Sequence, residues 1–155
     1  MLELLLNGEG ETLALASALA DAFAPGDLIG LEGGLGAGKT TFARGAIHAL
    51  GVPATTAVTS PTFALVHQYE GRFPIAHADF YRLNEGAELE ELGIDELLEE
   101  GCVLFVEWGR KFPSVASRAS LWVELEIVSD EARRVRLHPQ GERGEELIAG
   151  LSARL

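Results

Sequence analysis

The sequence has one cysteine, few basic residues and no long uninterrupted apolar segment. Cys102 has no second cysteine with which to form an internal disulfide, which is typical of proteins from a reducing compartment. The apolar window over residues 13–23 is much shorter than the roughly 20 residues that cross a bilayer. The start Met1-Leu2-Glu3 also lacks the basic residues of a secretory signal. We therefore expect a cytoplasmic protein that does not enter a membrane.

Basic residues are outnumbered by acidic ones, 12 against 24, and the formal net charge is −12. The segment 83–100 contains eight acidic and no basic side chains. Such a surface repels phosphate backbones, so we do not expect this chain alone to bind nucleic acid directly. The segment is interpreted first as a solvated helix face, and alternatively as a docking face for a basic partner.

Several signatures of other enzyme classes are missing. The histidines lack the spacing of metal ligands, which argues against a zinc site; they are His48, His67, His77 and His138. No serine, histidine and aspartate can be combined into a hydrolytic triad from the sequence. No Asn-Lys-x-Asp motif for guanine occurs, which argues against a GTPase.

The sequence does contain a phosphate-binding loop. Residues Gly33-Gly34-Leu35-Gly36-Ala37-Gly38-Lys39-Thr40 fit the spacing G-x-x-x-x-G-K-[ST]. An apolar strand at 28–31 precedes the loop and a helix at 41–50 follows it, so the helix N-terminus would face anionic oxygens. Backbone N–H groups of such a loop surround a di- or triphosphate. The predicted nucleotide contacts here are Gly33, Gly36, Ala37, Gly38, Lys39, Thr40 and Thr41.

The periodicity of the remaining sequence predicts one α/β domain over residues 1–155. The expected fold is a three-layer sandwich of the phosphate-loop NTPase type, with a mixed, largely parallel sheet, antiparallel hairpins and helices on both faces. Residues 103–106 are apolar throughout, as in a central parallel strand. A helix at 13–23 would be capped by Thr12. Further strands are expected at 2–6, 63–69, 73–79, 121–127 and 134–137, and further helices within 83–100 and at 142–155.

Phosphoryl transfer needs neutralising charge, a metal and a positioned nucleophile. Lys39 would contact the outer phosphates, and the Thr40 hydroxyl would bind Mg²⁺. Glu107, at the end of the apolar strand, would hold Mg²⁺ directly or through water, or polarise the attacking water. Asp79 would add a second carboxylate or orient water, although a structural pairing with Arg82 is an equal alternative. Thr62 follows the loop helix, where nucleotide switches keep a threonine that senses the last phosphate.

Four segments together resemble the bacterial TsaE (YjeE) family in order and spacing. They are the stretch from Gly33 to Phe42, Ser60-Pro61-Thr62-Phe63, the stretch from His77 to Leu83, and Glu107-Trp108. The resemblance extends from about Thr12 to Trp108 and is weak in the last third. It implies an ATPase subunit that works with TsaB- and TsaD-type partners to form threonylcarbamoyl-adenosine beside the anticodon of tRNA.

The resemblance also implies roles for single residues. Trp108 belongs to the functional strand end, and Glu9 and Arg133 are implied as further nucleotide contacts. The partners would hold the tRNA, which explains how an acidic chain can serve it. One departure is Gly34, where the family usually has aspartate; this removes a carboxylate beside the phosphates but leaves the backbone cradle unchanged.

Two other functions remain as alternatives. A small-molecule kinase would share the loop and use Asp79 as the base for an acceptor hydroxyl, but the acid-rich segment after Asp79 does not resemble the arginine-rich lid of such enzymes. A non-hydrolysing scaffold would use ATP only to order the segment from Ser60 to Phe63. No arginine of the chain is evidently placed to contact the outer phosphate as an arginine finger does; Arg44 lies on the helix that follows the phosphate loop, where it is badly placed. We therefore expect slow hydrolysis without partners.

Overall fold

The computed structural model describes residues 1–61, 64–84 and 86–153. The strands in these ranges are β1 (Leu2–Leu6), β2 (Leu28–Glu32), β3 (Val66–Glu70), β4 (Pro74–Asp79), β5 (Val103–Glu107), β6 (Leu121–Ile127) and β7 (Arg133–Pro139). The helices are α1 (Glu9–Ala20), α2 (Lys39–Ala49), α3 (Gly86–Glu91), α4 (Ile94–Glu99), α5 (Pro113–Ala116) and α6 (Gly141–Ser152). None of the helices in the described ranges has the length and apolar character needed to cross a bilayer.

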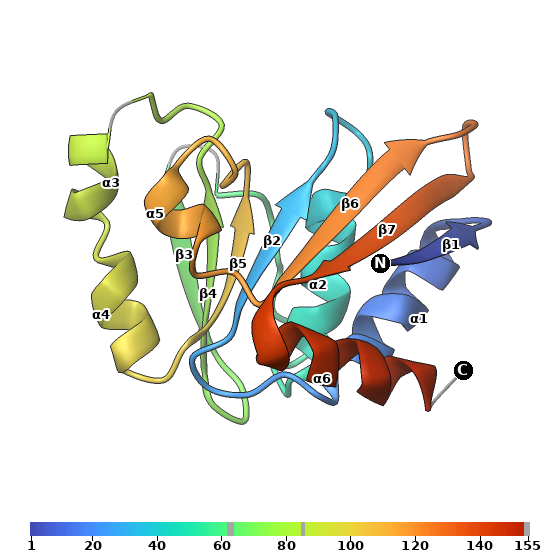
Figure 1. The fold of residues 1–155 in the computed structure, drawn as a ribbon, viewed down its shortest axis with the longest axis horizontal. Coiled ribbons are helices and arrows are strands. Elements are labelled where there is room, and N and C mark those ends of the chain that lie inside the picture. Colours follow the sequence, from blue (N-terminus) through green and yellow to red (C-terminus); the bar gives the residue numbers. More distant parts are fainter. Residues whose placement is uncertain (62–63, 85, 154–155) are drawn as a thin grey trace.

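The strands form one seven-stranded sheet in the order β1-β7-β6-β2-β5-β4-β3 (Figure 1). The central strands β6, β2, β5 and β4 are parallel to one another. The outer pairs β1/β7, β6/β7 and β3/β4 are antiparallel. The apolar residues of β2 and β5 fit the centre of the sheet, because a parallel strand there is covered on both faces. Every residue of β5 is buried, including Glu107 at its end.

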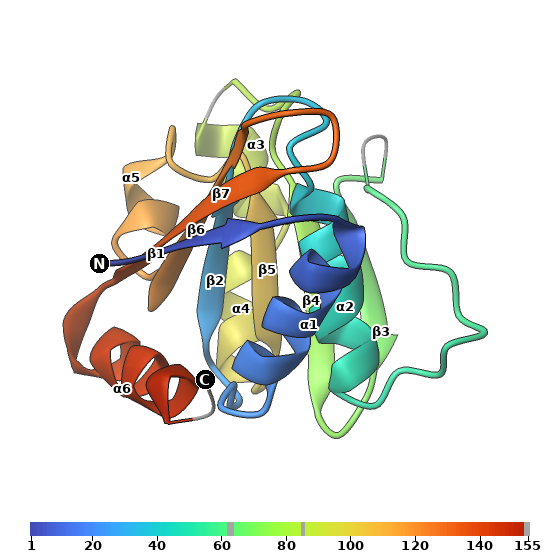
Figure 2. The same ribbon diagram turned by 90° about the vertical axis from the view of Figure 1, so that its right-hand side faces the viewer.

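Helices cover both faces of the sheet, and each face has its own apolar core. Helices α1 and α2 lie on one face (Figure 2), where α6 adds Leu147 and Leu151 to their core. Helices α3, α4 and α5 pack on the other face. Side chains of β5 alternate between the two cores, as the period of two in a strand requires: Val103 and Phe105 face α2, and Leu104 and Val106 face α4. The predicted three-layer α/β fold is confirmed.

The prediction was wrong at the start of α1. The helix begins at Glu9 rather than at residue 13, its N-cap is Gly8, and Thr12 is a buried residue inside the helix rather than a cap. Two carboxylates explain the earlier start. Glu9 and Glu11 lie in the first turn, where negative charge is favourable, and Glu11 accepts a hydrogen bond from the backbone N–H of Asn7.

Two further differences concern short segments. Strand β3 begins at Val66, so Ala64 and Leu65 of the predicted strand lie before it, and Leu65 has a left-handed backbone conformation with φ of 68°. Phe63, the first residue of the predicted strand, lies outside the described residues. Helix α5 was not predicted, since four residues are too few for a helical period; Pro113 in its first turn fits a helix start. The helices predicted within 83–100 are present as α3 and α4, and they bury Leu89, Ile94, Leu97 and Leu98 against the sheet.

Candidate functional site

The loop between β2 and α2 is shaped by glycine. Gly36 and Gly38 have φ of 79° and 108°, values that residues with a Cβ rarely adopt. Gly33 has φ of 149°, and a Cβ at this position would lie 2.5 Å from the carbonyl oxygen of Leu125. Gly38 is the N-cap of α2 and no side chain caps the helix. The first N–H groups of α2 therefore remain available to an anion, as at other helix starts.

Lys39 lies in the first turn of α2 and is almost completely buried. Its ammonium donates hydrogen bonds to the carbonyl oxygens of Gly33, at 2.6 Å, and Gly34, at 3.0 Å. It also lies 4.2 Å from the ring centroid of Trp108. Burial lowers the pKa of Lys39, and nearby carboxylates, above all Glu107, oppose this shift. Two backbone carbonyls of the loop thus fix the position of the Lys39 ammonium.

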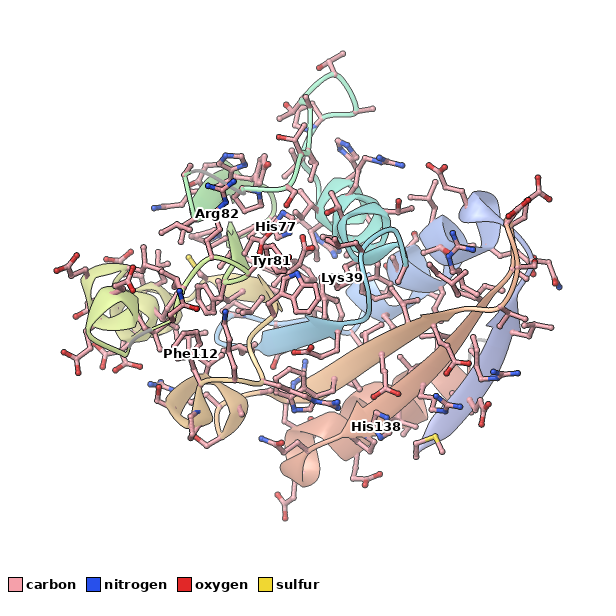
Figure 3. The ribbon with its side chains drawn as sticks, turned by 90° about the horizontal axis from the view of Figure 1, so that it is seen from above. Lys39, His77, Tyr81, Arg82, Phe112 and His138 are labelled. Carbon is pink, nitrogen blue, oxygen red and sulfur yellow. The ribbon has the colours of Figure 1, made fainter. Side chains whose placement is uncertain are left out.

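Trp108 follows β5 and is one of two described non-glycine residues with a left-handed backbone, at φ of 63°. This conformation is uncommon for a bulky side chain, and such strain is often found at functional sites. It directs the indole under Lys39, and the ring of Tyr81 lies against it with centroids 5.1 Å apart. Figure 3 shows Lys39 and Tyr81 close together at this end of the sheet.

The two predicted carboxylates meet at the ends of neighbouring strands. Asp79 of β4 is the register partner of Glu107 of β5, so both side chains lie on the α2 face of the sheet. Both are buried, at 6% and 3% exposure. Asp79 accepts hydrogen bonds from the Ser60 hydroxyl at 2.8 Å and from the backbone N–H of Tyr81 at 2.9 Å. These described partners differ from the suggested pairing of Asp79 with Arg82.

The Thr40 hydroxyl donates a hydrogen bond of 3.1 Å to Oε2 of Glu107. This spacing suits a magnesium ion, because adjacent ligands each about 2.1 Å from an octahedral ion lie roughly 3 Å apart. One hydroxyl and one carboxylate are enough protein ligands, since Mg²⁺ usually keeps several waters and takes further oxygens from a bound phosphate. The residues that the sequence singled out for the metal therefore fit it.

Two pockets lie on either side of the phosphate loop. The first has a volume of about 450 Å³, and its lining includes Lys39, Thr40, Ser60, Asp79, Tyr81, Glu107 and Trp108. The second has a volume of about 360 Å³, and its lining includes Glu9, Thr12, Asp130, Glu131 and Arg133. Gly36, Ala37, Gly38 and Thr41 line both. The structure thus divides the predicted contacts into a group around Lys39 and a group around α1 and the β6–β7 turn.

The side chains of Glu9 and Arg133, which line the second pocket, each have partners within the protein. Glu9 forms an ion pair with Arg44 of α2. Arg133 donates to the carbonyl oxygens of Ala37, at 3.2 Å, and Gly36, at 3.3 Å, and to carbonyls of the β6–β7 turn. Arg133 therefore links this turn to the phosphate loop. Thr62, the remaining predicted contact, lies outside the described residues.

His77 is a residue of this site that the sequence argument did not select. It is fully buried, and its Nε2 lies 2.6 Å from Oε2 of Glu107. The missed signal was the alternation of strand residues: His77 precedes Asp79 by two positions and so shares its face of β4. Ser60 and Tyr81 were also not selected.

A family model described as "Threonylcarbamoyl adenosine biosynthesis protein TsaE" matches residues 6–135. The chain belongs to the TsaE family. It is similar to the protein named "tRNA threonylcarbamoyladenosine biosynthesis protein TsaE" from Bacillus subtilis, with 38% identity over 92% of this chain and 88% of the relative. The protein of the same name from Aquifex aeolicus is 35% identical over 88% of this chain and 95% of the relative.

The chain is also similar to a solved structure. The crystal structure of YdiB from Bacillus subtilis superposes with a TM-score of 0.80 and 31% identity, over 99% of this chain and 95% of YdiB. The family model and the relatives confirm the family resemblance noted in the sequence. The superposition shows that the last third of the chain, where that resemblance was weak, shares the fold of YdiB as well.

Proposed function

We propose that this protein binds ATP with Mg²⁺ and hydrolyses it to drive partner proteins that form threonylcarbamoyl-adenosine in tRNA. The observation that carries the proposal is the meeting of Thr40 with Glu107, 3.1 Å apart, in the pocket that Lys39 lines. The family description and the names of the relatives support the link to tRNA modification. The formation of that product would need TsaB- and TsaD-type partners, as the family resemblance implies, and these would contact the tRNA.

The triphosphate would lie along the phosphate loop, in contact with backbone N–H groups from Gly36 to Thr41. Lys39 would place its charge against the outer phosphates, and its low-exposure site would strengthen this attraction. Thr40 and Glu107 would hold Mg²⁺, which neutralises charge on the phosphate oxygens. The nucleoside would extend toward the second pocket, where Glu9 and Arg133 lie.

Asp79 is suited to orient the attacking water. Its two oxygens are fixed by the Ser60 hydroxyl and the Tyr81 N–H, so the carboxylate keeps one orientation in the pocket. Arg44 is paired with Glu9 and so is not placed as an arginine finger for the outer phosphate. We therefore expect slow hydrolysis by the isolated protein and faster hydrolysis with the partners.

The test combines a binding and a rate measurement. Calorimetry with a non-hydrolysable ATP analogue should show binding that strengthens when Mg²⁺ is added. Phosphate release should increase when TsaB- and TsaD-type partners are supplied. Absence of analogue binding would refute the proposal. Equal rates of phosphate release with and without the partners would refute the claim that hydrolysis by this protein is coupled to them.

A further inference from the structure

The His77 side chain lies where an apolar residue would be expected. It belongs to the face of β4 that packs under α2, two residues along the strand from buried Ile75, and its register partner on β5 is buried Phe105. A polar ring placed in such surroundings loses its bonds to water, which is costly unless the protein replaces them. The structure replaces one of them, at Glu107.

The geometry identifies the hydrogen-bonding role of each ring nitrogen. An ionised carboxylate only accepts hydrogen bonds, so the contact of 2.6 Å between Nε2 of His77 and Oε2 of Glu107 places the ring proton on Nε2. The other nitrogen, Nδ1, is buried and has no hydrogen-bond partner among the described residues. A proton on Nδ1 would lack an acceptor there, which agrees with the Nε2–H tautomer.

The bonds from His77 and Thr40 converge on the same oxygen of Glu107. Nε2 lies 2.6 Å and the Thr40 hydroxyl 3.1 Å from Oε2, whereas Oε1 takes part in neither contact. The two groups come from different elements, β4 and α2, so together they hold this oxygen from two directions. If the Thr40 hydroxyl oxygen and Glu107 held a metal ion, Thr40 would no longer donate to this oxygen, and His77 would remain as the described group that orients it.

We propose that His77 is a positioning residue that donates its Nε2–H to Glu107 and thereby sets the carboxylate for the metal. This proposal rests on the proposed function, because it assumes that Glu107 binds Mg²⁺ beside a nucleotide. His77 acts through Glu107 and touches neither the metal nor the phosphates. Groups that orient metal ligands in this way typically change metal affinity or activity by 10- to 100-fold when they are removed.

The test replaces His77 with glutamine or with asparagine, whose side-chain amides differ in length by one methylene. His77→Gln places its side-chain NH₂ near the position of Nε2 and can still reach Glu107, whereas His77→Asn ends near the position of Nδ1 and cannot. With a non-hydrolysable ATP analogue present, Mn²⁺ binding is followed by electron paramagnetic resonance. His77→Asn should raise the Mn²⁺ dissociation constant about 10- to 100-fold. His77→Gln should remain close to the wild-type protein.

A matched control is His138→Asn. His138 lies on β7, far from Lys39 in Figure 3, and also has a glutamate beside it, with Nε2 3.7 Å from Oε2 of Glu124. This variant should leave Mn²⁺ affinity unchanged. If the wild-type protein binds no Mn²⁺ with the analogue, the proposed function fails. If the wild type binds and the two His77 variants behave alike, only the positioning role is overturned.

Two further measurements distinguish the positioning role of His77 from a general effect of its substitution on folding. In the Glu107→Gln background, His77→Asn should cause little further loss of Mn²⁺ affinity, because the group through which it acts is already changed; a full additional loss would overturn the proposal. The wild-type protein can also be tested without any substitution at position 77. Its ¹H–¹⁵N correlation spectrum should show the His77 ring as the Nε2–H tautomer, and an Nδ1–H tautomer would contradict the assignment.

Discussion

The two halves of the sheet use charged side chains in opposite ways. At the carboxyl ends of β5 and β4, Glu107 and Asp79 are 3% and 6% exposed. In the β1-β7-β6 half, each ion-paired side chain is 29–47% exposed; the pairs join Arg134 and Arg136 to Glu3, Glu124 and Glu126. Carboxylates are thus buried at the strand ends of one half and belong to a solvated network of ion pairs in the other.

The difference shows where charge serves the fold and where it is kept for a ligand. Exposed arginine and glutamate neutralise each other at low cost and contribute little stability, because water screens them. Beside Glu107 and Asp79, the hydrogen bonds found for Lys39 go to the carbonyl oxygens of Gly33 and Gly34 rather than to a carboxylate. Buried charges that do not neutralise one another destabilise the protein, and they are typical of functional sites. Four predictions test this contrast.

The largest effect is expected for Glu107→Gln. Loss of the carboxylate should lower the rate of phosphate release by about 10²- to 10⁴-fold, because the amide is a poor metal ligand and cannot accept a proton. Binding of the ATP analogue without metal should persist. A hydrolytic motor would then stall product formation by the partner complex, whereas a non-hydrolysing scaffold would continue to support it. Glu126→Gln on the exposed half is the matched control and should behave like the wild type.

Lys39→Ala should weaken binding of the ATP analogue by about 1 to 3 kcal/mol, through loss of a charge-assisted contact to the phosphates. Calorimetry measures this directly. The control is Lys111→Ala, since Lys111 is the other lysine of the sequence and is exposed, with its ammonium near the backbone of Tyr81. Equal affinities for the two variants would contradict the assignment of Lys39 to the phosphates.

Asp27→Asn should lower the free energy of unfolding by about 1 to 3 kcal/mol, as expected when a buried acceptor loses hydrogen bonds to a charged donor. Asp27 is buried, and its two oxygens accept hydrogen bonds from Nε and Nη2 of Arg143 at 2.9 and 2.8 Å. This pair joins the start of β2 to α6, away from the phosphate loop. Urea unfolding measures the loss, and affinity for the ATP analogue should not change with it.

The smallest effect is expected for Arg134→Gln. Arg134 contacts Glu3 at 3.0 Å and Glu126 at 2.7 Å, and all three side chains are at least a third exposed. Because such pairs are screened by solvent, urea unfolding should give the wild-type free energy within error. A loss as large as that of Asp27→Asn would remove the proposed contrast between the two halves of the sheet.

The sequence was most informative where the chemistry is local. The glycine spacing identified the loop at residues 33–40, and the apolar run before Glu107 identified a central strand, because each depends on neighbouring residues alone. The prediction failed at the start of α1, where Thr12 looked like a cap, and at α5, which is too short for a period. His77 was missed because its importance depends on a contact with Glu107, 30 positions away.

By itself, the sequence determined the phosphate loop, the likeness to the TsaE family and the carboxylate at the end of a buried strand. Only the tertiary structure decided which residues meet. Thr40 and Glu107 are 67 positions apart, and the parallel register of β4 with β5 sets Asp79 beside Glu107. The physical reason is that periodicity shows which face of an element is buried, whereas strand order and register arise from the packing of the whole sheet.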